Sequence, residues 1–336
     1  MKPFPSNLKY GMIALAVLFA AAVLPAMPGR AQPAIDRDWI SKAHRDHPLV
    51  GRIWSTSQRA FVPRDTLDRA IVASRYLLLG EKHDNPDHHL LQAEFLGVRA
   101  GVGDHPTVVF EMIPRALGDT LAAYLARPDA APAGIGAAVG WKKSGWPDWS
   151  IYRPIAETAF RHRLPIRPGG LANTTVRAVV RQGYAALGTA QETRWKLDQP
   201  LTGTAALRLA KILDASHCGL LPKAMAGPMI KAQRARDASM ADAMIAGGGP
   251  AVLIAGDGHV RTDFGVAAFL AIRQPDASRL AVGIVEVDPE ATRPGEYLAR
   301  DGVFDFLVFT PAFDTSDHCA ELKARMAEKS GKKKKP

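Results

Sequence analysis

Uninterrupted apolar runs recur along the chain and predict β-strands that are buried on both faces. A strand covered on one face only alternates apolar and polar residues, whereas these runs are continuous. The predicted strands are 75–81 (RYLLLGE), 107–113 (TVVFEMI), 164–169 (LPIRPG), 251–259 (AVLIAGDGH), 280–287 (LAVGIVEV) and 304–309 (FDFLVF), the third being the weakest. Residues 51–62 alternate instead, and this pattern predicts a hairpin.

Helical patterns lie between these strands. One helix is expected to begin with Asp84 or Asn85 as its cap and Pro86 in its first turn. Further helices are predicted at about 39–44, from about 153, at 228–246 and at 263–273. Because strands alternate with helices, the fold class is α/β, with a central mostly parallel sheet flanked by helices. The proline-, glycine- and alanine-rich residues 126–140 predict either a lid or a helical insertion.

The helix predicted at 228–246 carries a stripe of residues at helical spacing: Met229, Ala232, Arg236, Met240 and Met244. Methionine is flexible and fills irregular gaps in cores. The stripe is therefore interpreted as core packing rather than as a metal or cofactor site.

The first 31 residues have the order of a secretory signal. Lys2 and Lys9 precede an apolar stretch at about 11–24, and small residues follow up to Ala31. The apolar stretch is shorter than the roughly 20 residues that a membrane span needs. Cleavage after Ala31 is favoured over an uncleaved anchor, and the mature protein is expected to be periplasmic or secreted. Residues 32–320 are interpreted as a single α/β domain.

The net charge of +10 is concentrated at the two ends of the chain. The first 31 residues carry three basic and no acidic side chains, and the tail from Lys329 adds five lysines, which leaves +2 for residues 32–328. A body so close to neutral gives no indication of nucleic-acid binding. Residues 321–336 predict a basic disordered tail, with weak contact with anionic membrane surfaces as a second interpretation.

The two cysteines, Cys218 and Cys319, are far apart in the sequence. In an exported protein an even number of cysteines is compatible with a disulfide, and this pairing is favoured over two buried thiols. The motif SHCGLLP around Cys218 places His217 either beside a site or in an ordinary loop.

Two strands are followed by the same pattern of glycine, acid, any residue and histidine. Gly80, Glu81 and His83 follow one apolar run, and Gly256, Asp257 and His259 follow another. In open α/β sheets ligands bind beyond the carboxyl ends of the strands, and glycine lets the chain turn sharply there. Glu111 ends a third buried strand, where its carboxylate needs a partner, solvent or a cation. The candidate site thus comprises Glu81, His83, Glu111, Asp257 and His259, with hydrogen-bonded structural turns as the alternative.

Two further histidines, His88 and His89, follow in the predicted helix. His88 shares a helical face with Leu91 and Phe95 and is expected to pack or, less favourably, to reach the site. His89 is expected to face solvent.

Residues 140–160 (GWKKSGWPDWSIYRPIAETAF) gather three tryptophans and Tyr152. Exposed aromatic side chains at this density form a flat apolar surface for a planar ligand or a partner. The alternative is a loop that folds back and buries its own tryptophans. Tyr152 is a candidate ligand because tyrosinate ligates ferric haem iron in some proteins.

The ordered motifs LLLGEKHDNPDHH, VVFEMI, GWPDWSIYRPIAETA, SHCGLLP, AQRARDASMADAM and VLIAGDGHVRTDFGV resemble the ChaN-like family of haem-binding uptake proteins, over about residues 70–310. That family is similar to the Tiki, TraB-like and erythromycin esterase proteins. The resemblance implies an exported α/β protein that handles haem or iron, with two chains able to enclose haem. It implies Tyr152 as iron ligand, and His83 and His259 match the shared motif positions of the family. Trp146 and Trp149 are expected to bind the cofactor because a planar macrocycle would stack on the tryptophan-rich segment.

Two functions from different classes follow. The leading one is an exported haem-binding protein, and a non-catalytic role is favoured. The alternative is a zinc- or manganese-dependent hydrolase of a peptide, ester or lactone, in which Glu81, His83, Glu111, Asp257 and His259 hold the ion and activate its water. A third reading is an exported scaffold that has kept the motifs without their activity.

Overall fold

The computed structural model describes Met1 and residues 34–300 and 303–324. The predicted signal segment and most of the predicted basic tail lie outside the described residues. In the part of the chain that is described, no helix combines the length and the apolarity needed to cross a bilayer.

One sheet of eight strands forms the centre of the described residues, in the order β2-β1-β8-β7-β3-β6-β4-β5. The six strands from β8 to β5 are parallel, and the β1–β2 hairpin joins β8 in antiparallel direction. The strands are β1 (Ile53–Ser55), β2 (Ala60–Val62), β3 (Tyr76–Glu81), β4 (Thr107–Pro114), β5 (Ile166–Gly170), β6 (Ala251–Gly256), β7 (Arg279–Glu286) and β8 (Phe306–Thr310). This sheet confirms the α/β class and the strands predicted from the continuous apolar runs.

Helices cover both faces of the sheet. The α-helices are α1 (Arg64–Ala73), α2 (Pro86–Ala100), α3 (Gly118–Leu125), α4 (Ile135–Ala138), α5 (Trp149–Arg161), α6 (Asn173–Gln182), α7 (Thr189–Trp195), α8 (Gly203–Ser216), α9 (Ala226–Ile245), α10 (Asp257–Val260), α11 (Val266–Arg273) and α12 (Pro294–Arg300). Short 3-10 turns are Arg115–Leu117, Pro132–Gly134, Trp141–Lys143, Gly183–Leu187 and Lys223–Met225.

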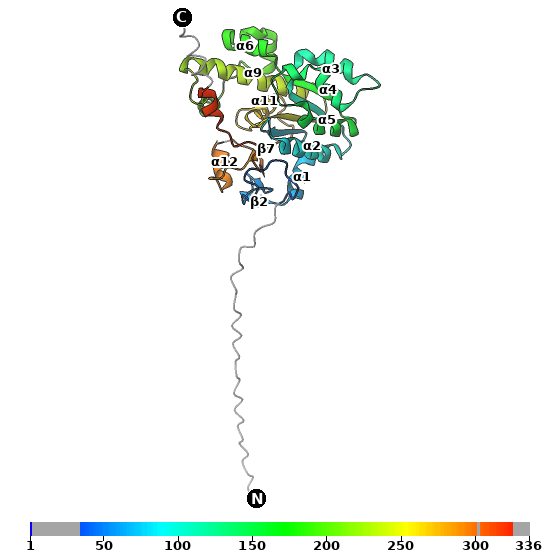
Figure 1. Cartoon of the computed structure of the whole chain (residues 1–336), viewed down its shortest axis with the longest axis vertical. Coiled ribbons are helices and arrows are strands. Elements are labelled where there is room, and N and C mark those ends of the chain that lie inside the picture. The colour runs from blue at the N-terminus through cyan, green and yellow to red at the C-terminus, as the bar shows by residue number, and fades with distance from the viewer. Residues whose placement is uncertain (2–33, 301–302, 325–336) are drawn as a thin grey trace. The chain divides into compact units, whose positions relative to one another are not determined.

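The core has two layers because strand side chains alternate between the faces of the sheet. On one face, Leu77, Leu79 and their neighbours pack with α1, α2, α3, α4 and α5. On the other, Leu78 and Leu253 pack with α7, α9, α11 and α12. Figure 1 shows α2, α3, α4 and α5 grouped together on one side of the molecule. The short helices between β4 and α5 are the helical insertion expected at 126–140.

The helix expected at 39–44 is wrong. The backbone N–H groups of Ile40 and Ser41 donate to the two carboxylate oxygens of Asp87, at 2.9 and 2.7 Å. Ala43 then forms an antiparallel bridge with Ala312. The Ala43 N–H, which a helix beginning at Trp39 would have bonded to the Trp39 carbonyl, donates to the Ala312 carbonyl at 3.2 Å instead.

Two predicted boundaries also change. The strand expected at 251–259 ends at Gly256, and Asp257 begins the short helix α10. The helix expected from about 153 begins at Trp149, because the Asp148 carboxylate accepts a hydrogen bond from the Ser150 N–H and caps it. By contrast α2 begins as predicted, with the Asn85 side chain accepting from the Asp87 N–H and Pro86 in the first turn.

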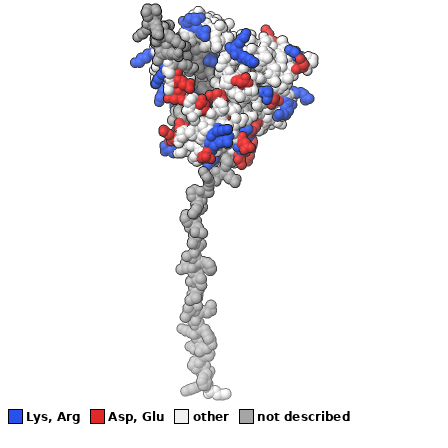
Figure 2. Space-filling model, in the orientation of Figure 1, with Lys and Arg blue, Asp and Glu red and all other residues white. Residues whose placement is uncertain are grey.

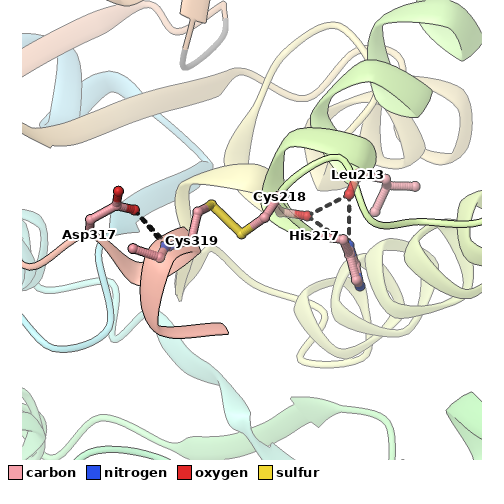
Figure 3. Close-up of a disulfide and its surroundings, with 7 residues drawn as sticks. Leu213, His217, Cys218, Asp317 and Cys319 are labelled. Carbon is pink, nitrogen blue, oxygen red and sulfur yellow. Dashed lines mark hydrogen bonds between the residues drawn. A yellow bond between two sulfur atoms is a disulfide. The ribbon is translucent and has the colours of Figure 1, made fainter. Parts of the chain in front are cut away.

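A disulfide joins Cys218 to Cys319, with the two Cα atoms 5.4 Å apart (Figure 3). Cys218 lies two residues beyond the end of α8, and Cys319 lies beyond the end of β8. Basic and acidic side chains are interspersed on the face that Figure 2 shows.

Candidate functional site

The candidate site lies at the carboxyl ends of three neighbouring strands. β3, β6 and β4 are adjacent in the sheet, and Glu81 at the end of β3 is in register with Gly256 at the end of β6. Glu111 lies near the end of β4. Because parallel strands end on the same edge, the sequence pattern brings these residues together in space.

Glu81 is the centre of the first cluster and its side chain has no exposed surface. The His83 Nδ1 donates to Glu81 Oε1 at 2.7 Å, and the His89 Nδ1 lies 3.0 Å from Oε2. The Tyr152 hydroxyl lies 3.2 Å from Oε1 and donates to it. Burial would raise the pKa of Glu81, but His89 and His83 outweigh it and hold that pKa well below its usual range.

His89 belongs to this cluster, and its expected exposure to solvent is wrong. Its side chain is fully buried, its ring centroid is 4.1 Å from that of Tyr152, and its Nε2 donates to the His83 carbonyl at 3.0 Å. Burial lowers the pKa of His89, but Glu81 outweighs it and the net shift is upward. Gln92, one turn further along α2, is also buried. The available signal was that His89 shares a helical face with Ala93 and Leu96, four and seven residues further on, and both are buried.

His88 is packed rather than part of the site. The Lys82 N–H donates to its Nδ1 at 2.9 Å, and its Nε2 lies 2.8 Å from the Thr310 hydroxyl. Burial lowers the pKa of His88 to about 3, so the ring is neutral. The packing interpretation of this histidine is confirmed.

His259 forms the second cluster with two carboxylates. Its Nε2 is 3.1 Å from Glu111 Oε1 and its Nδ1 is 2.5 Å from Asp237 Oδ1. Burial lowers the pKa of His259, but Glu111 and Asp237 outweigh it and raise that pKa to about 9. Glu111 Oε2 accepts from the Gly256 N–H at 2.9 Å, and Arg236 lies 3.5 Å from Oε1.

Asp237 was missed in the sequence. It lies on α9 one turn before Met240 and two turns before Met244, both of which are buried in the core. An acid on the core-facing stripe of a helix is the signal that could have found it, because a buried carboxylate needs a partner. Burial raises the pKa of Asp237 to about 6.

The two glycines of the repeated motif are explained by close packing. A Cβ atom on Gly80 would lie 2.2 Å from Asp257 Oδ1 and 2.7 Å from Val260 Cγ2. A Cβ atom on Gly256 would lie 2.9 Å from His83 Nε2. Each glycine therefore makes room for side chains of the other motif, and the two motifs form one unit.

A cavity of about 480 Å³ opens over this unit, within the size range of small-molecule sites. Its lining combines polar side chains of both motifs with apolar residues of α8. Its lining residues are Glu81, Lys82, His83, Leu209, Ile212, Leu213, Ser216, Gln233, Gly256, Asp257, Gly258, His259, Val285 and Glu286.

The five residues predicted to hold a metal ion do not converge on one point. Glu81 pairs with His83 and His89, and Glu111 pairs with His259. Across the described residues, no group of three or more histidine, cysteine, aspartate or glutamate side chains is placed to hold a metal ion. The zinc- or manganese-dependent alternative gains no support from this arrangement.

A family model described as haem-binding uptake, Tiki superfamily, ChaN matches residues 68–270, more than half of the chain. The chain belongs to the ChaN family. No curated protein matches the sequence.

A solved structure of a ChaN protein agrees with the family at the level of the fold. ChaN of Campylobacter jejuni, a structure of cofacial haem binding, is similar with a TM-score of 0.60 and 18% identity, covering 76% of this chain and 95% of that chain. An erythromycin esterase mutant, EreC, in its open conformation is more distant, with a TM-score of 0.43 and 13% identity over 76% of this chain and 95% of that chain.

In this ChaN-family chain, the three tryptophans of residues 140–160 differ in burial. Trp141 and Trp149 are buried, and their indole N–H groups donate to the carbonyls of Pro147 and Pro132 at 2.7 and 2.9 Å. Trp146 is half-buried, and its ring centroid lies 4.6 Å from that of His83. The loop therefore folds back over two of its tryptophans and leaves one beside the site.

Tyr152, the predicted iron ligand, is fully buried and does not line the cavity. Its hydroxyl lies 3.2 Å both from Glu81 Oε1 and from the His83 carbonyl. Burial and the neighbouring Glu81 raise its pKa, so the phenol is held neutral. His83 differs, since about a third of its side chain is exposed, 32%, and it lines the cavity.

Proposed function

We propose that this chain is an exported haem-binding protein that holds haem in the cavity beside His83. One observation carries the proposal, namely a partly exposed imidazole whose Nδ1 is bonded to a buried carboxylate, Glu81, at 2.7 Å. This bond leaves Nε2 for an external ligand, and carboxylate bonding of this kind orients a metal-ligating histidine and raises its basicity. Histidine is a common axial ligand of haem iron.

The rest of the cavity fits an amphipathic planar ligand. Leu209, Ile212 and Leu213 present apolar surface for a macrocycle, and the Trp146 ring lies beside His83. His259, with its raised pKa, adds a positive charge at the opposite motif. In this proposal Tyr152 and Trp149 do not contact haem, because both are buried, and they pack beneath the residues that do.

A titration with ferric haem tests this proposal. The wild-type chain is expected to bind one haem per chain with the absorption and electron paramagnetic resonance signature of imidazole ligation. His83→Gln removes the ligand and should lower affinity at least about tenfold, the equivalent of 1.4 kcal/mol. Tyr152→Phe should keep the imidazole signature. His162→Gln, at the C-terminal end of α5, serves as the control.

Two results would contradict the proposal. Loss of the native signature in Tyr152→Phe but not in His83→Gln would make Tyr152 the ligand, as the family resemblance implies. Absence of stoichiometric haem binding by the wild-type chain would remove the proposed function itself.

The proposal includes export, a role in haem or iron uptake and the pairing of two chains. The signal-like order of the first 31 residues supports export, and the description of the family supports uptake. Fractionation of cells that express the chain with and without residues 2–31 tests export. Growth of a deletion strain on haem as iron source tests uptake, and light scattering with and without haem tests pairing.

A further inference from the structure

Helix α8 contributes one wall of the cavity that the two motifs also line. Leu209, Ile212, Leu213 and Ser216 line the cavity from this helix. The helix does not pack into either of the two main core layers. It rests on a small separate cluster whose buried members are Ala205, Leu209, Leu213 and Phe264.

Met229 and Ile230 of α9 pack against the same cluster, and α8 has two further polar attachments among the described residues. Thr202 caps its first turn by accepting from the Ala205 N–H. Arg208 pairs with Asp263 at 2.8 Å, but its side chain is about half exposed, 48%, so the pair contributes little. The outer face of the helix is exposed, and Leu207 keeps 76% of its surface. An element with so little buried apolar surface opens locally more readily than the core.

The disulfide holds the C-terminal end of α8. Cys218 follows Ser216 by two residues, and its partner Cys319 lies in the segment that follows β8 (Figure 3). That segment is fixed where Ala312 bridges Ala43 and where the Phe313 N–H donates to Glu286 Oε1 at 2.9 Å. Glu286 itself lines the cavity.

We propose that the Cys218–Cys319 bridge keeps the α8 wall closed over the cavity, so that the oxidised protein retains its ligand and opening of the bridge releases it. The identity of the ligand as haem rests on the proposed function. Opening is thiol–disulfide exchange with a dithiol. The dithiol supplies two electrons and two protons, the S–S bond becomes two cysteine thiols, and the dithiol becomes a cyclic disulfide.

The release rate of haem tests the inference. Haem-loaded wild type and the double variant Cys218→Ser/Cys319→Ser are mixed with an excess of a haem-scavenging globin, and transfer is followed by absorbance. The double variant is expected to release haem several-fold faster. The single variants Cys218→Ser and Cys319→Ser should match it, because each breaks the same bridge. Leu207→Ala, on the exposed face of α8, is the control that should release haem like the wild type.

Amide hydrogen exchange of the haem-free proteins gives a second measurement that does not depend on haem. Exchange in α8 should accelerate when the bridge is absent, whereas exchange in the buried part of α9 should not change. Should the double variant fail to fold, folded wild type is opened with a dithiol, which is removed before haem is added.

The outcomes separate the inference from the proposed function. If the wild type binds no haem, the proposed function fails, and the assignment of haem as the retained ligand fails with it. If the wild type binds haem but release is unchanged without the bridge, the inference alone is overturned, whether or not α8 exchanges faster.

Discussion

Replacement of Gly256 by alanine tests whether the close contact between Gly256 and His83 is needed for the site. The backbone of Gly256 has φ −60° and ψ 149°, an extended conformation that alanine adopts without strain. The added methyl group would lie 2.9 Å from His83 Nε2 and 3.1 Å from Cε1. The imidazole must therefore retreat to an ordinary contact of about 3.5 Å, a shift of about half an ångström.

That shift acts on the bond between His83 and Glu81, which is 2.7 Å long in the native site. A hydrogen bond to a charged group contributes roughly 1.5–3 kcal/mol. If the bond is lost, the affinity for haem should fall about ten- to a hundredfold. The pKa of His83 should also fall, because Glu81 is the largest of the contacts that raise it against the effect of burial.

Haem titration by absorbance and titration of the His83 ring by NMR measure the two effects. Gly227→Ala is the control, because a Cβ atom there meets nothing within 4 Å and Gly227 does not line the cavity. Unchanged haem affinity and unchanged His83 pKa in Gly256→Ala would refute the reasoning. Equal damage from Gly227→Ala would refute it as well, since the effect would then not depend on contact with His83.

Substitutions at three other residues test the buried network. The pKa of His259 rises from 6.5 to about 9 on folding. The protonated ring therefore stabilises the folded protein fully below pH 6.5, and this contribution of about 3 kcal/mol is lost as pH rises through 9. Urea unfolding should show the loss in the wild type and not in His259→Gln. His89→Phe leaves the buried Glu81 without its contact at Oε2 and should lower the free energy of unfolding by about 3 kcal/mol in the same assay. A loss below about 1 kcal/mol would argue against a charged pair of His89 and Glu81. Asn85→Ala removes the cap of α2 and should cost about 1–2 kcal/mol. Asn85→Asp should not recover this stability, because the Asn85 Nδ2 donates to Glu286 Oε1 at 2.8 Å and a carboxylate there would repel Glu286.

Continuous apolar runs made the strands predictable, and two repeated motifs made one edge of the sheet predictable. The pattern is informative because a strand buried on both faces must be apolar at every position. It does not determine where the backbone turns, so the strand at β6 was extended past Gly256 into α10. The failed helix at 39–44 has a similar origin, since the acceptor of the Ala43 N–H, the Ala312 carbonyl, lies far along the chain.

The half of the site that was missed comes from helices rather than from strand ends. Asp237 reaches His259 from α9, and His89 reaches Glu81 from α2. Which face of a helix points inward depends on its rotation and on what it packs against, and polar residues on a core-facing stripe weaken the periodic signal. The sequence pattern therefore located the acids and histidines at the strand ends and just beyond them more reliably than those on the long helices α2 and α9.

Burial also decides what Tyr152 is able to do. Tyrosinate at this position would place a second negative charge 3.2 Å from Glu81, in surroundings that exclude water. Two such charges repel strongly at low dielectric, and the neutral phenol instead donates a hydrogen bond that helps to hold Glu81 ionised. Ligation of iron by Tyr152 would require α5 to move so that the hydroxyl leaves Glu81, whereas ligation by His83 requires no such movement. Tyr152→Phe is therefore expected to loosen the orientation of His83 and broaden the spectrum of the haem complex without removing the iron ligand.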